Sequence, residues 1–302
     1  MPPALLPNPN GYDDFLKAGA LVVGDVSSAP TFGLEELRTL MLTNAEPLRL
    51  LRLGLSRACS VPTDSFITNF SMSDLGTLKG LAYVLVGEGR LAELENRPAD
   101  ATRSYLDAIR FGNEISRGGL VIHRLVGAAC QFIGGSPLAK LAPRLGCDQS
   151  RPVIAELEKI DSDAVPWEQI WANEKRFRRY QLRGSVNPIM WIASWWQTRP
   201  ALKRADERNQ RIAARLRLLT VELALDCYRS EKGHGPAQLE QLVPVNLSRV
   251  PLDSFSGRPL IYRASGTNWL LYSVGPDGVD DGGRPAGGSM TNRGDLLSDS
   301  KW

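Results

Sequence analysis

The chain has few of the residues that most often carry out chemistry. Its 302 residues include two histidines and four cysteines, and the cysteines are far apart with no C-x-x-C spacing. This pattern excludes a dense disulfide framework and argues against a structural zinc site. One long-range disulfide is possible, but four free buried thiols fit the pattern better, because free cysteine behaves as a small hydrophobe.

Sequence motifs of catalysis are also missing. The chain has no G-x-S-x-G elbow, no phosphate-binding glycine loop and no H-E-x-x-H motif. His123 lies among apolar residues and is expected to be a core or boundary residue, while His234 in a Gly-His-Gly turn needs only a structural role. Cys59 with His123 could suggest a thiol nucleophile, but nothing local activates the sulfur. An enzyme with a pocket in the helical region is therefore the less favoured hypothesis, and no small-molecule substrate is identified.

Neither charge nor hydropathy points to a special environment. With 43% hydrophobic residues, 23% charged residues and a net charge of +3, the chain is an ordinary globular protein, and no nucleic acid is expected as a partner. The start lacks a signal peptide, and the longest apolar stretch, 118–135, is interrupted by His123, Arg124 and Gln131. We expect a soluble chain, unless an anchoring segment precedes Met1 in the native gene.

Helical periodicity dominates the first 199 residues, after an irregular arm rich in proline, glycine and serine. Residues 88–110 are typical of one tetratricopeptide-type helix pair, although only one unit can be counted. We predict an all-α helical domain over 1–199 that binds protein partners. Its expected helices are 12–20, a run from 34 to 55, 74–95, a helix starting at Pro98, 118–145 and 151–160.

Tryptophan and arginine gather at the end of this region, between 167 and 196. Such residues suit a membrane interface, which would make the protein peripherally membrane-bound. They could equally stack single-stranded nucleic acid, or simply fill the seam between two domains with arginine stems lying over the aromatics. We favour the last interpretation. The candidate interaction residues are Trp191, Trp195, Trp196, Arg176, Arg178 and Arg179.

From residue 200 the pattern changes to one long amphipathic helix followed by short strands. The helix is expected over 200–229, ending at Gly233, and the strands over 260–263 and 269–274 with a hairpin loop between them. The chain is therefore predicted to be α+β, with an all-α domain over 1–199 and an α/β module over 200–302.

Aspartate and glycine concentrate in a loop after the second predicted strand, at 275–283. Carboxylates and backbone carbonyls are the ligands that calcium prefers, and glycines let the backbone curl around an ion. Several carboxylates in one loop would also repel one another unless a cation lay between them. The other interpretation is a solvated acidic turn with ordinary Asp-Gly geometry.

The segment 200–302 also matches the order of motifs in a known family. The motifs are Tyr228-Arg229, Gly233-x-x-Pro236, Pro251-x-Asp253-x-x-x-Gly257-x-Pro259, Ser273-x-Gly275-x-Asp277-Gly278, Gly282-Gly283, Asp295-Leu296 and Trp302. On these residues the segment, about a third of the chain, resembles the soluble part of the major pseudopilin of type II secretion systems. The resemblance implies a long helix packed on a small antiparallel sheet.

In that family the final loop binds one calcium ion. Carried over by position, the resemblance implies a backbone carbonyl from Val274 and side-chain ligands from Asp277 and Asp295. Asp280 and Asp281 have no fixed counterpart in the family but lie within reach in the sequence. The chain departs from the family in having a helical domain, rather than a leader and an apolar anchor, before the matching helix. The resemblance therefore implies the fold and the ion site, and not filament assembly.

Together these features predict a non-enzymatic protein of the cell envelope or of a secretion system, with a calcium-stabilised pseudopilin-like module and a helical domain for protein partners. A segment absent from this sequence could anchor it, and a cytoplasmic location stays open. The alternative is a soluble scaffold, or a peripheral membrane-binding protein, whose module holds no ion.

Overall fold

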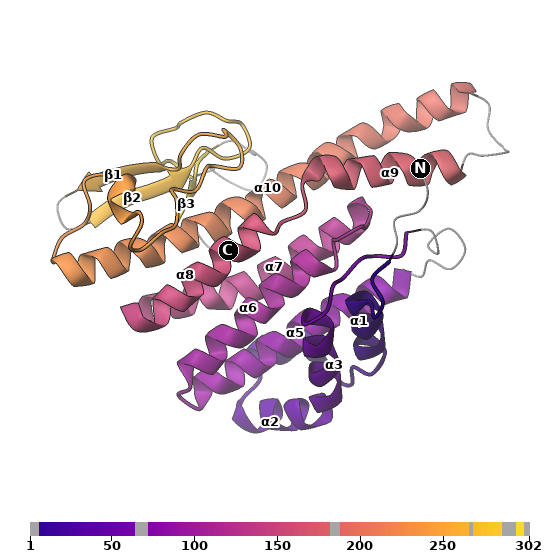
Figure 1. Ribbon diagram of the computed structural model, residues 1–302, viewed down its shortest axis with the longest axis horizontal. Helices are drawn as coiled ribbons and strands as arrows, with labels where there is room; N and C mark the ends of the chain where they lie inside the picture. Colours follow the sequence, from indigo (N-terminus) through magenta and orange to yellow (C-terminus); the bar gives the residue numbers. More distant parts are fainter. Residues whose placement is uncertain (1–5, 64–71, 182–187, 266–267, 286–293, 299–302) are drawn as a thin grey trace. The chain divides into compact units, whose positions relative to one another are not determined.

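The computed structural model describes residues 6–63, 72–181, 188–265, 268–285 and 294–298, and it divides into two compact units (Figure 1). The helical unit comprises 1–134 and 164–208, and the C-terminal unit comprises 135–163 and 209–302. The chain is mostly helical with one small antiparallel sheet, which agrees with the predicted α+β class. The C-terminal unit includes 135–163, a segment predicted from the sequence to belong to the all-α domain over 1–199.

The helical unit is built from short N-terminal helices and a long helical hairpin. Tyr12, Phe15, Leu51, Leu85 and Phe111 are among the side chains that fill its core. Its elements are α1 (Gly11–Ala20), a 3₁₀ turn η1 (Val26–Thr31), α2 (Leu34–Thr43), α3 (Ala45–Leu55), α5 (Met72–Leu94), α6 (Pro98–Glu114), most of α7 (Val121–Leu141), α9 (Trp167–Gln181) and the first part of α10 (Pro188–Lys232).

Glycines set how closely the helices of this unit approach one another. A β-carbon on Gly89 of α5 would lie 2.3 Å from the ring of Tyr105 in α6. A β-carbon on Gly112 of α6 would lie 2.4 Å from the carbonyl oxygen of Gly127 in α7. Both distances are far below van der Waals contact, so α6 packs directly on the backbones of its two neighbours.

Buried asparagines connect the loops of the helical unit to its helices. Asn44, which is 0% exposed, donates to the carbonyl oxygens of Val23 and Leu40 at 3.0 and 2.9 Å and accepts from the Val23 amide at 3.0 Å. Asn10 similarly donates to the Ser60 carbonyl and accepts from the Ser60 amide. A primary amide suits this task, because it donates and accepts at the same point.

The C-terminal unit places a small sheet beside the second half of α10. Strand β1 (Ile261–Ser265) pairs antiparallel with β2 (Asn268–Ser273), in the register Ile261 to Tyr272, and β2 pairs antiparallel with β3 (Leu296–Leu297). Trp269 of β2 donates its indole N–H to Glu222 of α10 at 3.3 Å. The guanidinium of Arg229 lies 4.7 Å from the centre of the same ring, so one tryptophan fixes the sheet to the helix.

A further helix of this unit, α8 (Cys147–Ser162), lies alongside α10. Asp161 near the end of α8 accepts from Arg217 at 2.9 Å, and Arg151 near its start is paired with Glu231. Residues near the end of α8 therefore contact residues earlier in α10, and residues near the start of α8 contact the end of α10, so the two helices are antiparallel. The 3₁₀ turns η2 (Ala142–Arg144) and η3 (Leu239–Leu242) complete the unit.

One described helix is long and apolar enough to cross a membrane by composition alone. It is α7 with the turn after it, Val121–Arg144, and 56% of its most apolar window is buried inside the molecule. Three polar residues of α7, His123, Arg124 and Gln131, are buried as well. A core helix of a folded protein has the same composition and burial, so this stretch is weak evidence for a membrane.

Candidate functional site

The loops at the C-terminal end are organised by a buried aspartate in the Pro251–Pro259 turn. Asp253, 1% exposed, accepts hydrogen bonds from the Phe255 amide at 3.0 Å and from the Ser256 hydroxyl at 3.3 Å. Its oxygens also accept from the Ser273 hydroxyl at 2.8 Å and the Val274 amide at 3.0 Å. One carboxylate therefore fixes its own turn and the end of β2, from which the Asp/Gly loop starts.

Asp295, a predicted ligand, plays the same part at the other end of the loop. It is 1% exposed and accepts from the Gly283 amide at 2.7 Å and, more weakly, from the Asp281 amide at 3.4 Å. Burial raises the pKa of this carboxyl above its ordinary value, and the nearby charges of Asp280 and Asp281 raise it further. The structure therefore brings Asp280 and Asp281 close enough to Asp295 to disfavour its charged form.

Asp280 is exposed and held by side chains of the sheet. It accepts from the Tyr272 hydroxyl at 2.7 Å, from the Gly282 amide at 2.9 Å and from Arg263 at 3.4 Å. The hydrogen bond from Tyr272 lowers the pKa of this carboxyl, with a smaller contribution from Arg263. Burial raises the pKa of the Tyr272 phenol to about 12, and the same hydrogen bond with Asp280 contributes to the rise.

The other predicted ligands lie apart from these hydrogen bonds. Asp277 is exposed and accepts a local hydrogen bond from the Val279 amide at 3.3 Å. Val274 is buried, and its amide faces Asp253. Gly275 between them has a φ of 69°, and a β-carbon there would lie 2.3 Å from the Gly294 carbonyl, which explains the glycine at this position.

A calcium site needs several oxygen atoms that point toward one centre. Among the residues that the structure describes, no group of three or more histidine, cysteine, aspartate or glutamate side chains is placed to hold a metal ion. The carboxylates of Asp280 and Asp295 face amide and hydroxyl donors, as the hydrogen bonds above show. In this arrangement the described residues do not form a coordination sphere for calcium, and calcium binding stays a prediction.

The predicted interaction residues are spread over two helices. Arg176 of α9 donates to the Thr63 hydroxyl at 3.3 Å, Arg178 is paired with Glu174 at 3.2 Å, and Arg179 is exposed. Trp191, Trp195 and Trp196 fall in α10, but their side chains lie outside the part of the chain that the structure describes. Trp167, at the start of α9, packs against a small apolar cluster that includes Val121 and Ile170.

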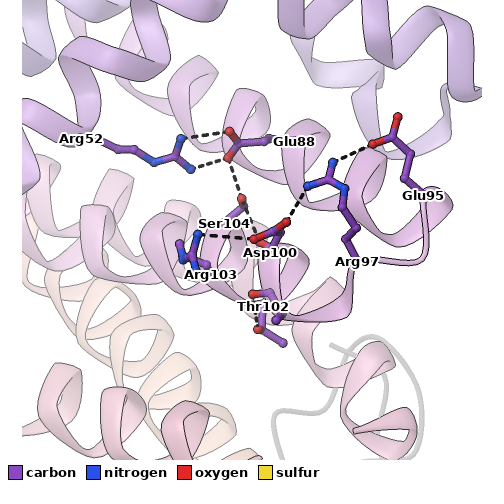
Figure 2. A network of polar contacts seen from close by, with 9 residues as sticks. Arg52, Glu88, Glu95, Arg97, Asp100, Thr102, Arg103 and Ser104 are labelled. Atoms are coloured by element: carbon purple, nitrogen blue, oxygen red, sulfur yellow. Dashed lines mark hydrogen bonds and ion pairs between the residues drawn. The ribbon is translucent and has the colours of Figure 1, made fainter. Parts of the chain in front are cut away.

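A polar network covers the hairpin of α5 and α6, where the tetratricopeptide-like pair was expected (Figure 2). Arg52 of α3 binds both carboxylate oxygens of Glu88 in α5, which also accepts from the Ser104 hydroxyl in α6 at 2.6 Å. At the turn of the hairpin, Arg97 pairs with Asp100 at 2.6 Å and with Glu95 at 2.7 Å. These pairs fix the geometry of the hairpin and leave a charged, partly exposed face.

Two residues considered for nucleophilic chemistry have structural partners. His123 accepts the Leu120 amide on its Nδ1 atom at 3.1 Å, and burial lowers its pKa to about 4, so the ring is neutral and caps the start of α7. Burial also raises the pKa of the Cys59 thiol far above its usual range, and the thiol donates to the Glu114 carbonyl at 3.3 Å. A thiol held in this way is a poor nucleophile.

A groove of about 330 Å³ lies within the C-terminal unit, between α8, α10 and the segment that leads to Pro251. Several charged side chains that line the groove are bound to one another or to nearby backbone and hydroxyl groups. Glu158 accepts from the Ser248 amide and hydroxyl, both at 2.9 Å, and Arg217 donates to Asp161 and to the Leu252 carbonyl. The hydrogen bonds along the groove therefore fasten α8 and α10 to the loop that precedes the sheet.

Comparison with known proteins found no matching family model, no matching curated protein and no matching solved structure. The assignment of function accordingly depends on the residues and contacts described above.

Proposed function

We propose that the protein is a non-enzymatic component of the cell envelope or of a secretion system. In this proposal the C-terminal unit is a pseudopilin-like module and the helical unit binds protein partners. The observation that carries the proposal is the contact made by Asp253. This residue joins the Pro251–Pro259 turn to Ser273 and Val274, so two motifs of the resemblance meet at one buried carboxylate. The long helix α10 beside a small antiparallel sheet supports the same module.

Partner binding can be tested by crosslinking in the native cell. A photoreactive amino acid is introduced at Arg103 of α6, whose side chain is 70% exposed, and, as a matched control, at Val279 of the Asp/Gly loop, which is 53% exposed. We expect crosslinks to envelope proteins from the α6 position and a reduced amount of exported protein when the gene is deleted. Recovery of the chain only in the cytoplasm, with unchanged export, would contradict the proposal.

The second candidate is a scaffold or peripheral membrane-binding protein whose module needs no ion. The hydrogen bonds already made by Asp280 and Asp295 favour it, because the loop is then held by the chain itself. Thermal melts in calcium, in magnesium and in a chelator separate the two candidates. A rise in Tm with calcium alone that Asp277→Ala removes supports the ion-stabilised module, and coincident melts support the second candidate.

Membrane contact is tested separately with vesicles that contain anionic lipid. If the tryptophan and arginine region binds the interface, the wild type co-sediments with the vesicles, and the double variant Trp195→Ala/Trp196→Ala stays in the supernatant. Equal sedimentation of the two proteins would remove this role, since interfacial binding depends on buried aromatic surface.

A further inference from the structure

The groove between α8 and α10 is lined by both apolar and charged side chains. Leu157 of α8, Leu216 of α10 and Pro251 contribute apolar surface. The volume of about 330 Å³ lies at the lower end of the range for sites that bind small molecules. All the lining residues belong to the C-terminal unit, so the groove is formed inside one compact body.

The walls of the groove are fixed to one another by hydrogen bonds. Arg217 of α10 donates to Asp161 of α8 at 2.9 Å and to the Leu252 carbonyl at 2.8 Å. Glu158 of α8 accepts from the Ser248 amide and hydroxyl, both at 2.9 Å. These contacts join two helices and a loop and still leave the space between them open. A ligand therefore meets a preformed site.

Two cations of the groove take no part in these contacts. Lys159 and Arg249 line the groove and are exposed, and neither side chain has an ion pair or a hydrogen bond with any residue that the structure describes. With Arg217 the lining carries three cations against two acids, Glu158 and Asp161, so its net charge is +1. Both acids are already engaged by donors, and the charge left for a ligand is positive.

We propose that this groove binds a small organic monocarboxylate that carries an aliphatic or aromatic group. The apolar group lies against Leu157, Leu216 and Pro251. The carboxylate pairs with Arg249, whose planar guanidinium can donate to both oxygens at once, and Lys159 adds a second positive charge.

The lining favours this class over the simpler alternatives. An inorganic anion would leave the apolar surface unused, and an uncharged apolar molecule would leave both cations unpaired. A doubly charged phosphate would exceed the net charge of the lining and would face the carboxylates of Glu158 and Asp161. The inference is independent of the proposed function, because partner binding by the helical unit and the fold of the module do not require a ligand here.

The full-length chain is tested by titration with hexanoate, followed by NMR of its leucine methyl groups. We expect the signals of Leu157 and Leu216 to shift with a dissociation constant on the order of 1 mM. The signals of Leu51 and Leu85 in the helical unit should stay in place. Hexan-1-ol has the chain without the charge, and sulfate has charge without the chain. Each should bind about tenfold more weakly than hexanoate, or less.

Two variants connect the binding to a named cation. Arg249→Gln removes an exposed guanidinium that has no partner among the described residues, so the fold should be kept and the dissociation constant should rise about tenfold. Arg258→Gln is the matched control, since Arg258 is an exposed arginine of the same unit outside the groove, and it should leave binding unchanged.

Several results would overturn the proposal. They are equal affinity of hexanoate for the wild type and Arg249→Gln, binding of hexan-1-ol or sulfate as tight as that of hexanoate, and shifts confined to leucines outside the groove. A short peptide with a free carboxyl terminus that binds where hexanoate does not would also overturn it, and would assign the groove to a protein partner.

Discussion

Buried polar side chains fasten loops in both units, but the helical unit uses neutral amides where the C-terminal unit uses carboxylates. In the helical unit, Asn10 and Asn44 each bind a backbone carbonyl and a backbone amide of a distant segment. In the C-terminal unit, Asp253 and Asp295 accept from backbone amides, and Asp253 from hydroxyls as well.

The difference follows from what converges at each point. A carboxylate only accepts, so it suits a place where several N–H and O–H groups point inward, as in turns rich in glycine and serine. An amide side chain both donates and accepts, so it suits a place where one segment of backbone offers both its N–H and its C=O. The amide connections are therefore insensitive to pH, whereas the connection made by Asp295, whose pKa is raised, depends on it.

Replacing the buried amide of Asn44 by a carboxylate should have the largest effect on stability. In Asn44→Asp the carbonyls of Val23 and Leu40 would face a buried carboxylate that cannot donate, at a cost of about 3 kcal/mol or more in the free energy of unfolding at neutral pH. The introduced carboxyl would have a raised folded pKa, so stability should be partly recovered as the pH falls through that value. Urea unfolding at pH 7 and pH 5 measures both effects. A loss equal to that of Asn44→Ala, with no pH dependence, would contradict this explanation.

The reverse exchange at Asp253 should cost somewhat less. Asp253→Asn keeps one accepting oxygen but turns an NH₂ group toward amide and hydroxyl donors, and we expect a loss of about 2 to 3 kcal/mol by urea unfolding. The matched control is Asp277→Asn, an exposed aspartate of the neighbouring loop, which should change stability by less than about 0.5 kcal/mol. Similar values for the two variants would show that Asp253 does not organise these loops.

Close helix packing in the helical unit is tested within a single helix. Gly89→Ala places a β-carbon against the Tyr105 ring and should destabilise by about 1 to 3 kcal/mol. Gly76, also in α5, has no atom within 4 Å of a built β-carbon, so Gly76→Ala should stabilise the chain by about 0.5 to 1 kcal/mol. Thermal or chemical unfolding of both variants gives the comparison. Effects of the same sign would contradict the packing described here.

The smallest effect on stability is expected from the pH-dependent protonation of the loop carboxylates Asp280 and Asp295. Asp295 has a raised pKa, so its charge opposes folding at neutral pH, and this cost is relieved as the pH falls through the raised value. Asp280 has a lowered pKa, so its contribution is present above its unfolded pKa and is lost as the pH falls through the folded value. NMR titration of the two carboxyl carbons should show these opposite shifts. Bound calcium would bring the pKa of Asp295 down, and an unchanged titration in calcium would argue against the ion.

Periodicity and capping predicted most of the helices in this fold. The helices expected over 12–20, 74–95 and from Pro98 are present as α1, α5 and α6, because their apolar spacing and end residues are local properties. The strands 260–263 and 269–274 correspond to β1 and β2, shifted by about one residue. Helix α9 was not predicted, because its tryptophans and arginines were interpreted as an interaction surface or a domain seam and not as the two faces of a helix. Helix α10 begins at Pro188 and not at Pro200, so Pro200 lies inside the helix, a position that local sequence rules disfavour for proline.

The candidate site was predictable only in part. Asp/Gly composition pointed to the loop, and the structure does bring Asp280, Asp281 and Asp295 near one another. Composition could not show that the Asp280 and Asp295 oxygens face Tyr272 and Gly283, because those contacts depend on the sheet. Asp253 belonged to a quoted motif but was not among the predicted site residues. Its burial follows from the folding of its turn onto the end of β2, which local sequence does not encode.

The division of the chain into units has a consequence for its synthesis. Because the C-terminal unit is assembled from 135–163 and 209–302, α8 leaves the ribosome well before the sheet and most of α10 exist. At ordinary translation rates this wait is on the order of ten seconds. During it, the apolar residues that α8 buries in the finished protein, Val153, Ile154, Leu157 and Ile160, lack their final cover. The nascent chain therefore exposes an apolar face of α8 during synthesis, and a fragment cut at residue 200 would leave this face without the part of the unit that follows it.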